Sequence, residues 1–137
     1  MTKELIQLSF DKIMQTRNYT VVILAAREKR FAIYTEPSIG KVLQLFLTGV
    51  QKSRPLTFDL ITSIFDGYNI QVKQVVINDL VDTTYYARLF LEQDEGDLKH
   101  VVEIDARPSD CISIALMNNV PVFCTRDVLD RTIHIED

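Results

Sequence analysis

The sequence predicts an α+β fold in a single domain, residues 1–137, with mainly antiparallel β hairpins packed against three main helices. Strand-like runs occur in neighbouring pairs separated by short polar turns, and other segments repeat apolar residues at helical spacing. A chain of 137 residues with 47% hydrophobic and 25% charged residues is long enough to bury one core. No second domain is therefore expected.

The first third of the chain predicts three strands. Apolar and polar residues alternate over residues 6–11, which is typical of a half-buried strand, and residues 19–25 form a continuous run suited to a central strand. The charged residues 27–30 then predict a hairpin turn into a strand at residues 31–34. The basic side chains of this turn are able to contact phosphate, but charged turns are usually solvated, and we expect the solvated state.

Two helices follow. Pro37 at a first helical position and Gly49 at the end bracket apolar residues at three- and four-residue intervals, namely Ile39, Val42, Leu43 and Phe46. Thr57 is expected to cap a second helix over residues 58–66, which Gly67 ends. Its predicted buried stripe consists of Leu60, Ile61, Ile64 and Phe65.

The middle of the chain predicts two hairpins. Residues 70–77 and 84–91 are strand-like, and residues 78–83 form the turn between them. That turn contains Asp79 and Asp82, which are possible ligands, although aspartate is also a standard turn residue and we favour the turn. A second hairpin passes through the acidic residues 92–97, which we expect to point away from any nucleic acid.

The most informative stretch is residues 104–110, where a strand end meets the start of an apolar helix. Pro108 fits the first helical turn, and Asp105, Arg107, Ser109 and Asp110 surround it. The helix, residues 111–117, is apolar on nearly all sides and should be buried. A short apolar run over residues 120–125 and a short helix over 126–130 complete the domain.

Two interpretations of this junction are open. Asp105 and Asp110 are able to share a hard cation such as Mg²⁺ or Mn²⁺, with Arg107 facing a phosphate. Alternatively, the same short polar residues only stabilise free N–H groups at a helix start, and Arg107 pairs with one of the carboxylates. Spacing alone favours the structural interpretation.

Three motifs also resemble a known family. They are residues 104–110 followed by Pro121 and residues 126–129; residues 54–60; and residues 75–80 leading to 85–89. Together they are similar to the signature of the bifunctional nuclease domain family, named for members that degrade both DNA and RNA. The resemblance covers most of the chain and implies a bifunctional nuclease-like domain over residues 1–137.

The resemblance implies a metal-dependent nuclease that hydrolyses phosphodiester bonds of DNA or RNA. Asp105, Arg107 and Asp110 would be catalytic, with Mg²⁺ or Mn²⁺ on Asp105 and Asp110 and with Arg107 stabilising negative charge. The expected substrate contacts are Ser109, Arg54 and Lys52.

An alternative is a catalytically weak or silent family member that acts as an oligomeric binding or scaffold domain. The resemblance implies a Glu and a His at two positions where this chain has Ile39 and Phe58, and neither apolar side chain binds a cation or moves a proton. The net charge of −4 also argues against a broad cationic surface.

Residue counts exclude other classes. Four glycines in separate places form no glycine-rich phosphate loop, and two histidines form no histidine-rich zinc site. Cys111 and Cys124 lack ligand spacing and should be buried thiols. Without a long apolar run or a signal peptide, a cytoplasmic protein with no membrane partner is expected. Exposed strand edges predict self-association, most simply as a homodimer.

Overall fold

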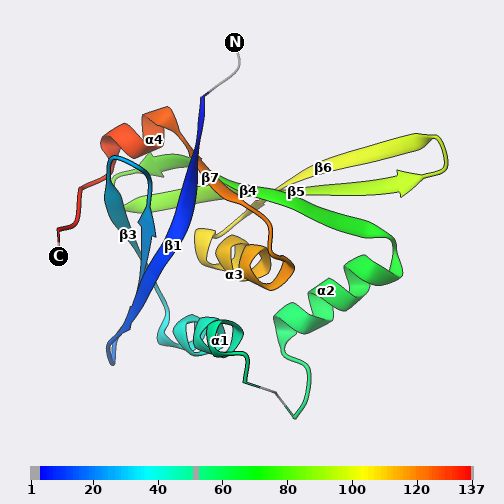
Figure 1. The fold of residues 1–137 in the computed structure, drawn as a ribbon, viewed down its shortest axis with the longest axis horizontal. Helices are drawn as coiled ribbons and strands as arrows, with labels where there is room; N and C mark the ends of the chain where they lie inside the picture. The colour runs from blue at the N-terminus through cyan, green and yellow to red at the C-terminus, as the bar shows by residue number, and fades with distance from the viewer. Residues whose placement is uncertain (1–3, 51–52, 137) are drawn as a thin grey trace.

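The computed structural model describes residues 4–50 and 53–136 and contains one seven-stranded sheet and four helices within them (Figure 1). In chain order the elements are β1 (Leu5–Gln15), β2 (Thr20–Ala25), β3 (Arg30–Thr35), α1 (Pro37–Thr48), α2 (Thr57–Gly67), β4 (Ile70–Val81), β5 (Thr84–Glu95), β6 (Leu98–Ala106), α3 (Pro108–Asn118), β7 (Val122–Thr125) and α4 (Arg126–Arg131). The α+β prediction is confirmed.

The sheet has the strand order β3-β2-β1-β7-β4-β5-β6. It consists of two antiparallel units, β1 to β3 and β4 to β6, which the four-residue strand β7 joins. Strand β7 pairs antiparallel with β1 and parallel with β4, so a late segment of the chain lies at the centre of the sheet.

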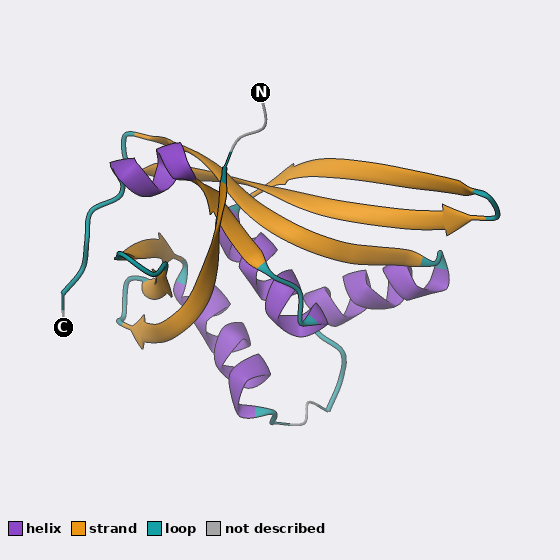
Figure 2. Ribbon diagram, turned by 45° about the horizontal axis from the view of Figure 1, so that its top comes forward, coloured by secondary structure: helices purple, strands orange, loops and turns teal. Residues whose placement is uncertain are grey.

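Helices α1, α2 and α3 gather on one side of the sheet, and α4 lies apart from them near the start of β1 (Figures 1 and 2). The core lies between α3 and the strands, where Leu43, Ile77 and Ile112 are almost fully buried. Nearly every side chain in the first two turns of α3 is buried, as the sequence predicts for an apolar helix. Across residues 4–50 and 53–136, no helix has both the length and the apolar character needed to cross a membrane.

Helix α2 differs from its prediction. Leu56, rather than Thr57, is the capping residue, and its N–H donates to the Asp59 carboxylate at 2.7 Å. Leu60 and Ile64 are 57% and 48% exposed, so the predicted buried stripe is wrong at these two positions. The physical reason is that α2 lies at the margin of the helix layer, where β4, α3 and Phe46 of α1 cover its other faces but not these two residues.

The two long hairpins have tighter turns than the sequence predicts. Strand β4 runs to Val81, so Asp79 lies within a strand and only Asp82 and Thr83 turn the chain. Asp82 has a positive φ of 56°, a conformation that aspartate tolerates. Strand β5 likewise continues to Glu95, and the β5–β6 hairpin projects beyond the helices (Figure 1).

The charged turn between β2 and β3 is not simply solvated, which corrects that prediction. Lys29 Nζ donates to the Leu129 carbonyl oxygen at 2.5 Å, and Arg30 Nη1 lies 2.6 Å from Asp11 Oδ2. Arg126 Nη1 binds Glu28 Oε1 at 2.9 Å. The turn therefore ties the first hairpin to β1 and α4.

Candidate phosphate-binding site at the start of α3

The junction between β6 and α3 folds as the sequence predicts. Strand β6 ends at Ala106, Arg107 is the extended capping residue with φ −65° and ψ 143°, and Pro108 opens the helix. Helix α1 begins in the same way, with extended Glu36 before Pro37. Neither capping side chain accepts a hydrogen bond from a backbone N–H of its own helix, so both helices begin without a side-chain cap.

An ion-pair cluster joins these two helix starts. Arg107 binds Asp110 through two hydrogen bonds, Nε to Oδ2 at 3.0 Å and Nη2 to Oδ1 at 3.3 Å. Its third contact, Nη1 to Glu36 Oε1 at 3.2 Å, reaches across 71 positions of sequence to α1. The hydrogen bond to Asp110 is the main cause that raises the pKa of Arg107, so the guanidinium stays charged. The Arg107 side chain is nevertheless 59% exposed.

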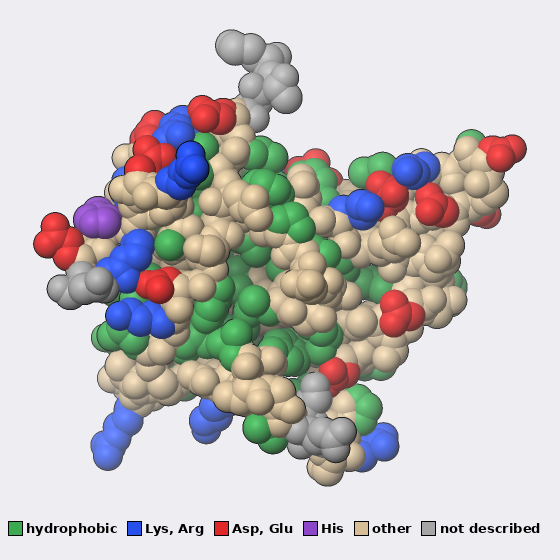
Figure 3. Space-filling model, viewed as in Figure 1, with side chains coloured by type: hydrophobic (Ala, Val, Ile, Leu, Met, Phe, Trp, Pro, Cys, Tyr) green, Lys and Arg blue, Asp and Glu red, His purple; other side chains and the backbone are tan. Residues whose placement is uncertain are grey.

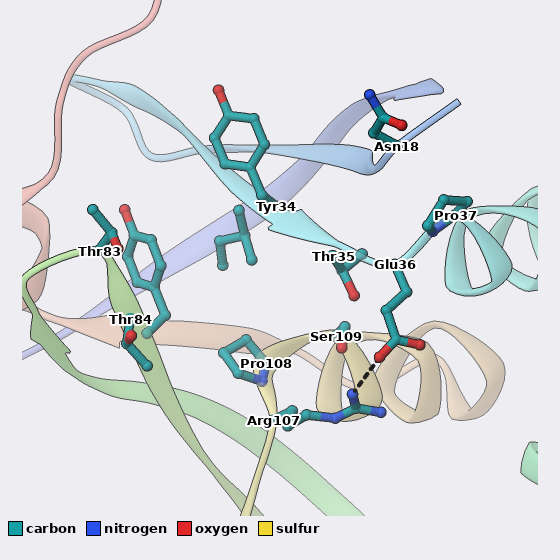
Figure 4. A pocket seen from close by; sticks show the side chains of 12 residues that line it. Asn18, Tyr34, Thr35, Glu36, Pro37, Thr83, Thr84, Arg107, Pro108 and Ser109 are labelled. Atoms are coloured by element: carbon teal, nitrogen blue, oxygen red, sulfur yellow. Dashed lines mark hydrogen bonds and ion pairs between the residues drawn. The ribbon is translucent and has the colours of Figure 1, made fainter. Parts of the chain in front are cut away.

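A pocket of about 560 Å³ opens beside this cluster (Figure 4). Glu36, Arg107 and Ser109 line one side and Tyr34 faces them, and Tyr85 is a further lining residue. The remaining lining residues are Asn18, Ile33, Thr35, Pro37, Thr83, Thr84 and Pro108. Hydroxyl groups, one guanidinium and the Glu36 carboxylate therefore surround a space that is open to solvent.

The two aromatic side chains of the pocket differ in exposure. Tyr34 is 65% exposed and makes an edge contact with Tyr19, with ring centroids 5.3 Å apart. Tyr85 is half-buried and stacks on the core residue Phe31 at 5.7 Å. Burial raises the pKa of Tyr85, so its hydroxyl remains a neutral donor at neutral pH. Tyr34 is thus free to meet a ligand, while Tyr85 anchors the pocket to the core.

Comparison with protein families shows to which family the chain belongs. The model of the bifunctional nuclease domain matches residues 21–136. The chain belongs to the bifunctional nuclease domain family. The resemblance in the sequence motifs is therefore confirmed at the level of the family.

Relatives come from bacteria and plants. An uncharacterized protein of Mycobacterium tuberculosis (strain H37Rv) is 32% identical over 120 residues, which are 86% of this chain and 69% of the relative. Bifunctional nuclease 1 of Arabidopsis thaliana is 33% identical over 86 residues, 63% of this chain and 26% of that protein. Bifunctional nuclease 2 of Oryza sativa subsp. japonica is 34% identical over the same length, 63% of this chain and 26% of that protein. The matched segment is thus about a quarter of each of these plant relatives.

The structure brings some of the predicted family site residues together and separates others. Arg107, Asp110 and Ser109 meet at the pocket or its rim, although Ser109 is largely buried. Arg54 lines a different, shallow depression with Asp59, away from the residues of the Arg107 pocket. Lys52 lies outside the described residues.

Asp105 is exposed at the end of β6 and does not line the pocket. Its charge, like that of Asp110, reaches the buried thiol of Cys111, whose pKa rises to about 12, mainly through burial and then through Asp110 and Asp105. Both carboxylates therefore act on the same buried group near the start of α3.

The donor set for a metal ion is small. Within residues 4–50 and 53–136, no group of three or more His, Cys, Asp or Glu side chains is placed to hold a cation. Mg²⁺ is usually held by only one or two protein carboxylates, with water and phosphate oxygens completing its shell. Asp105 and Asp110 match that number of carboxylates, and each oxygen of Asp110 retains a lone pair beyond its bond to Arg107.

Sequence reasoning missed Glu36 and Tyr34. Glu36 carries a signal that is visible in the sequence, since it precedes Pro37 as Arg107 precedes Pro108, and both pairs mark helix starts. Nothing in the sequence shows that the two starts meet. Tyr34 reads simply as a strand residue, and it lines the pocket with Thr84 of β5 although the sheet order separates β3 from β5.

Proposed function

We propose that this chain is a metal-dependent nuclease that hydrolyses phosphodiester bonds of DNA or RNA at the Arg107 pocket. The observation that carries the proposal is the meeting of two helix starts around an exposed guanidinium, beside an open pocket rich in hydroxyl groups. Membership of the bifunctional nuclease domain family supports the same reaction class.

Phosphate is the ligand that this chemistry suits best. The first-turn N–H groups of α1 and α3 carry positive partial charge, and an arginine presents parallel donors that match phosphate oxygens. Glu36 and Asp110 hold the guanidinium in place before a substrate arrives, which lowers the entropic cost of binding. The exposed ring of Tyr34 would offer a surface on which a nucleic-acid base stacks.

Asp105 and Asp110 are the residues that would hold Mg²⁺ or Mn²⁺. When bound, such an ion supplies Lewis-acid stabilisation of the phosphoryl oxygens and lowers the pKa of bound water. Arg107 would stabilise charge that develops on the phosphate, and Ser109 lies in reach of the same space. Arg54 and Lys52 are proposed to contact the nucleic-acid backbone outside the pocket.

A second candidate function is binding without catalysis. Phe58 and Ile39, which stand where the family resemblance implies a His and a Glu, are buried in the core. These positions supply no acid, base or ligand in this chain. A silent domain that binds nucleic acid at Arg107 is therefore the runner-up.

A cleavage assay with labelled single- and double-stranded DNA and RNA separates the two functions. Purified protein is incubated with Mg²⁺, Mn²⁺ or excess chelator, beside Asp105→Asn/Asp110→Asn and Arg107→Gln variants. The nuclease proposal expects metal-dependent cleavage that falls at least about a hundredfold in each variant, as is typical when a charge-stabilising group is lost.

The matched control is Arg126→Gln. Arg126 also bonds two carboxylates, Glu28 at 2.9 Å and Glu4 at 3.5 Å, but it does not line the Arg107 pocket. Cleavage by this variant should stay within about twofold of wild type. Cleavage that survives in the aspartate variants, or that is absent from wild type, would contradict the nuclease proposal, and retained oligonucleotide binding would then favour the silent domain.

The proposal also includes a cytoplasmic location and self-association. The first agrees with the lack of a membrane-spanning helix in the described ranges and is tested by cell fractionation. The second rests on an exposed sheet edge, whose geometry is developed below.

A further inference from the structure

Strand β6 forms one edge of the sheet, and its side chains are exposed almost throughout. Residues 98–105 are all exposed to solvent, and only Ala106 is half-buried. Four of these residues are large and apolar: Leu98 at 64%, Val101 at 66%, Val102 at 48% and Ile104 at 40% exposure. A long strand edge with this composition is a template for pairing with another strand.

Apolar residues occur on both faces of this edge. Val102 and Ile104 stand opposite Leu91 and Leu89 of β5, which are buried, so the core face of the sheet continues onto β6 without a helix to cover it. Val101 lies on the other face, because neighbouring strand residues alternate. Neither face of the β6 edge is therefore protected.

The opposite edge of the sheet is protected within the chain. Along β3, the C-terminal segment donates the Ile135 N–H to the Arg30 carbonyl oxygen at 2.9 Å, and Arg30 Nη2 donates to the Ile135 carbonyl oxygen at 3.2 Å. No described segment does the same for β6, which pairs with β5 alone. The two edges thus differ in what the chain itself provides.

We propose that β6 pairs antiparallel with β6 of a second copy of this chain, about a two-fold axis at Val101. The backbone directions permit this. Glu95 and Leu98 close the hairpin as its first hydrogen-bonded pair, and hydrogen-bonded and non-hydrogen-bonded pairs then alternate along β5 and β6. Residues of β6 in the non-hydrogen-bonded pairs direct their backbone groups away from β5. The N–H and C=O groups of Lys99, Val101 and Glu103 consequently point outward, toward a partner strand.

The sequence of β6 is self-complementary in this register. A two-fold axis at Val101 places Val101 opposite Val101 of the partner and Leu98 opposite the partner's Ile104. It also places Lys99 opposite the partner's Glu103, and by symmetry the charge pair occurs twice. Every apolar residue except Val102 meets an apolar residue, and Val102 meets His100.

Neighbouring symmetric registers match less well. An axis at Val102 would also form a charge pair, Lys99 with Asp105, but it would place Val101 opposite Glu103 and His100 opposite Ile104. An axis at His100 would place the two imidazoles opposite each other and Lys99 opposite Val101. Apolar pairing therefore selects the Val101 axis, which also keeps a charge pair. Pairing ends at Leu98, because Asp97 belongs to the turn.

A second copy suits this edge better than nucleic acid does. Glu95 and Asp97 lie at the tip of the hairpin, and acidic side chains gather there in Figure 3. A phosphate backbone along β6 would be repelled by that tip, whereas an antiparallel copy carries its own tip to the far end of the pairing.

Sedimentation of the full chain tests the proposal. Wild type should form a dimer whose population rises with concentration. Val101→Lys would place two ammonium groups opposite each other at the axis and should give a monomer. The matched control is Ile133→Lys, which adds the same charge at a residue that is 83% exposed and distant in sequence, and which should leave the dimer intact.

A charge reversal tests the register. Lys99→Glu and Glu103→Lys should each raise the dimer dissociation constant about tenfold, because each creates two like-charge pairs. The double variant should return to within about threefold of wild type. Within one chain Lys99 pairs with Glu92 at 3.2 Å and Glu103 with Arg88 at 3.7 Å, and the double variant restores neither, so recovery reports the contact between copies.

Three results would overturn the proposal: a wild type that stays monomeric at every concentration, a Val101→Lys variant that still dimerises, or a double variant that does not recover. Loss of oligonucleotide binding by Val101→Lys at unchanged mass would also overturn it. Because sedimentation needs no catalysis, the dimer stands or falls separately from the nuclease proposal.

Discussion

The two hairpins at the ends of the sheet resemble each other in sequence but differ in environment. Strand β2 is apolar and almost wholly buried, β3 buries Phe31 and Ile33, and the turn between them is held by Lys29 and Arg30. Strand β6 is also rich in β-branched residues, yet its side chains lie in solvent. The difference shows that an apolar strand pattern does not by itself decide burial, which depends on what else in the chain packs against the strand.

The largest expected effect comes from truncation in the buried hairpin. Phe31→Ala removes a fully buried ring that stacks on Tyr85, and it should lower the free energy of unfolding by about 3–5 kcal/mol. Urea denaturation followed by circular dichroism measures this. Val101→Ala in the exposed strand is the counterpart, and a loss as large as that of Phe31→Ala would break the comparison.

A smaller loss of stability should follow from adding a methyl group where α1 packs closely against β2. A methyl group at Gly40 would overlap Gln15 Oε1 and Thr20 Oγ1, and Thr20 is fully buried with no room to move. Gly40→Ala should therefore cost about 1–3 kcal/mol in the same denaturation experiment. Gly67→Ala is the control: nothing lies within 4 Å of its added methyl group, so it should be neutral or slightly stabilising.

The two buried thiols should make the free energy of unfolding depend on pH. Burial raises the pKa of Cys111 to about 12 and of Cys124 to about 11, from an ordinary value of 9.0. Below about pH 9 both thiols are protonated in the folded and in the unfolded protein, so their full contribution to the free energy of unfolding is retained. Above it the unfolded thiols ionise first, which favours unfolding, so stability should fall as pH rises from 9 toward 12, by at most about 1.4 kcal/mol per pH unit for each thiol.

Denaturation at a series of pH values, under reducing conditions, measures that slope. A Cys111→Ala/Cys124→Ala variant should show a shallower decline above pH 9 than wild type, although its stability at neutral pH will be lower through lost packing. An unchanged slope would mean that these thiols do not control alkaline unfolding.

The smallest expected change in the free energy of unfolding comes from a substitution in the exposed strand β6. Val102→Thr keeps the β-branched shape at a residue that is 48% exposed, so the free energy of unfolding of the monomer should change by less than about 0.5 kcal/mol. Denaturation at low protein concentration tests the monomer alone. A change above 1 kcal/mol, on the order of a core substitution, would show that Val102 is packed within one chain.

Local patterns predicted most of the elements, because caps and periodicity act over a few residues. Pro37, Gly49 and Pro108 mark helix ends where the structure has them. Burial was harder. Leu60 and Ile64 follow helical spacing as closely as the buried residues of α1 do, but periodicity does not reveal how much of a helix its neighbours cover.

The candidate site shows the same division between local and long-range information. Arg107 and Asp110 are three residues apart, and their pairing follows from helix geometry. The contact with Glu36 depends on how α1 and α3 pack, which no local pattern encodes. The roles of Asp105, Ser109, Arg54 and Lys52 remain predictions for the cleavage assay.

Strand β7 has a consequence for the order of folding. It supplies the described pairing between the two antiparallel units, through four residue pairs with β1 and three with β4, and it is the last strand to be synthesised. During translation the two hairpin units can each begin to collapse, but the sheet cannot close until residues 122–125 arrive. A nascent chain held before that point would therefore expose both open flanks to chaperones or to neighbouring nascent chains.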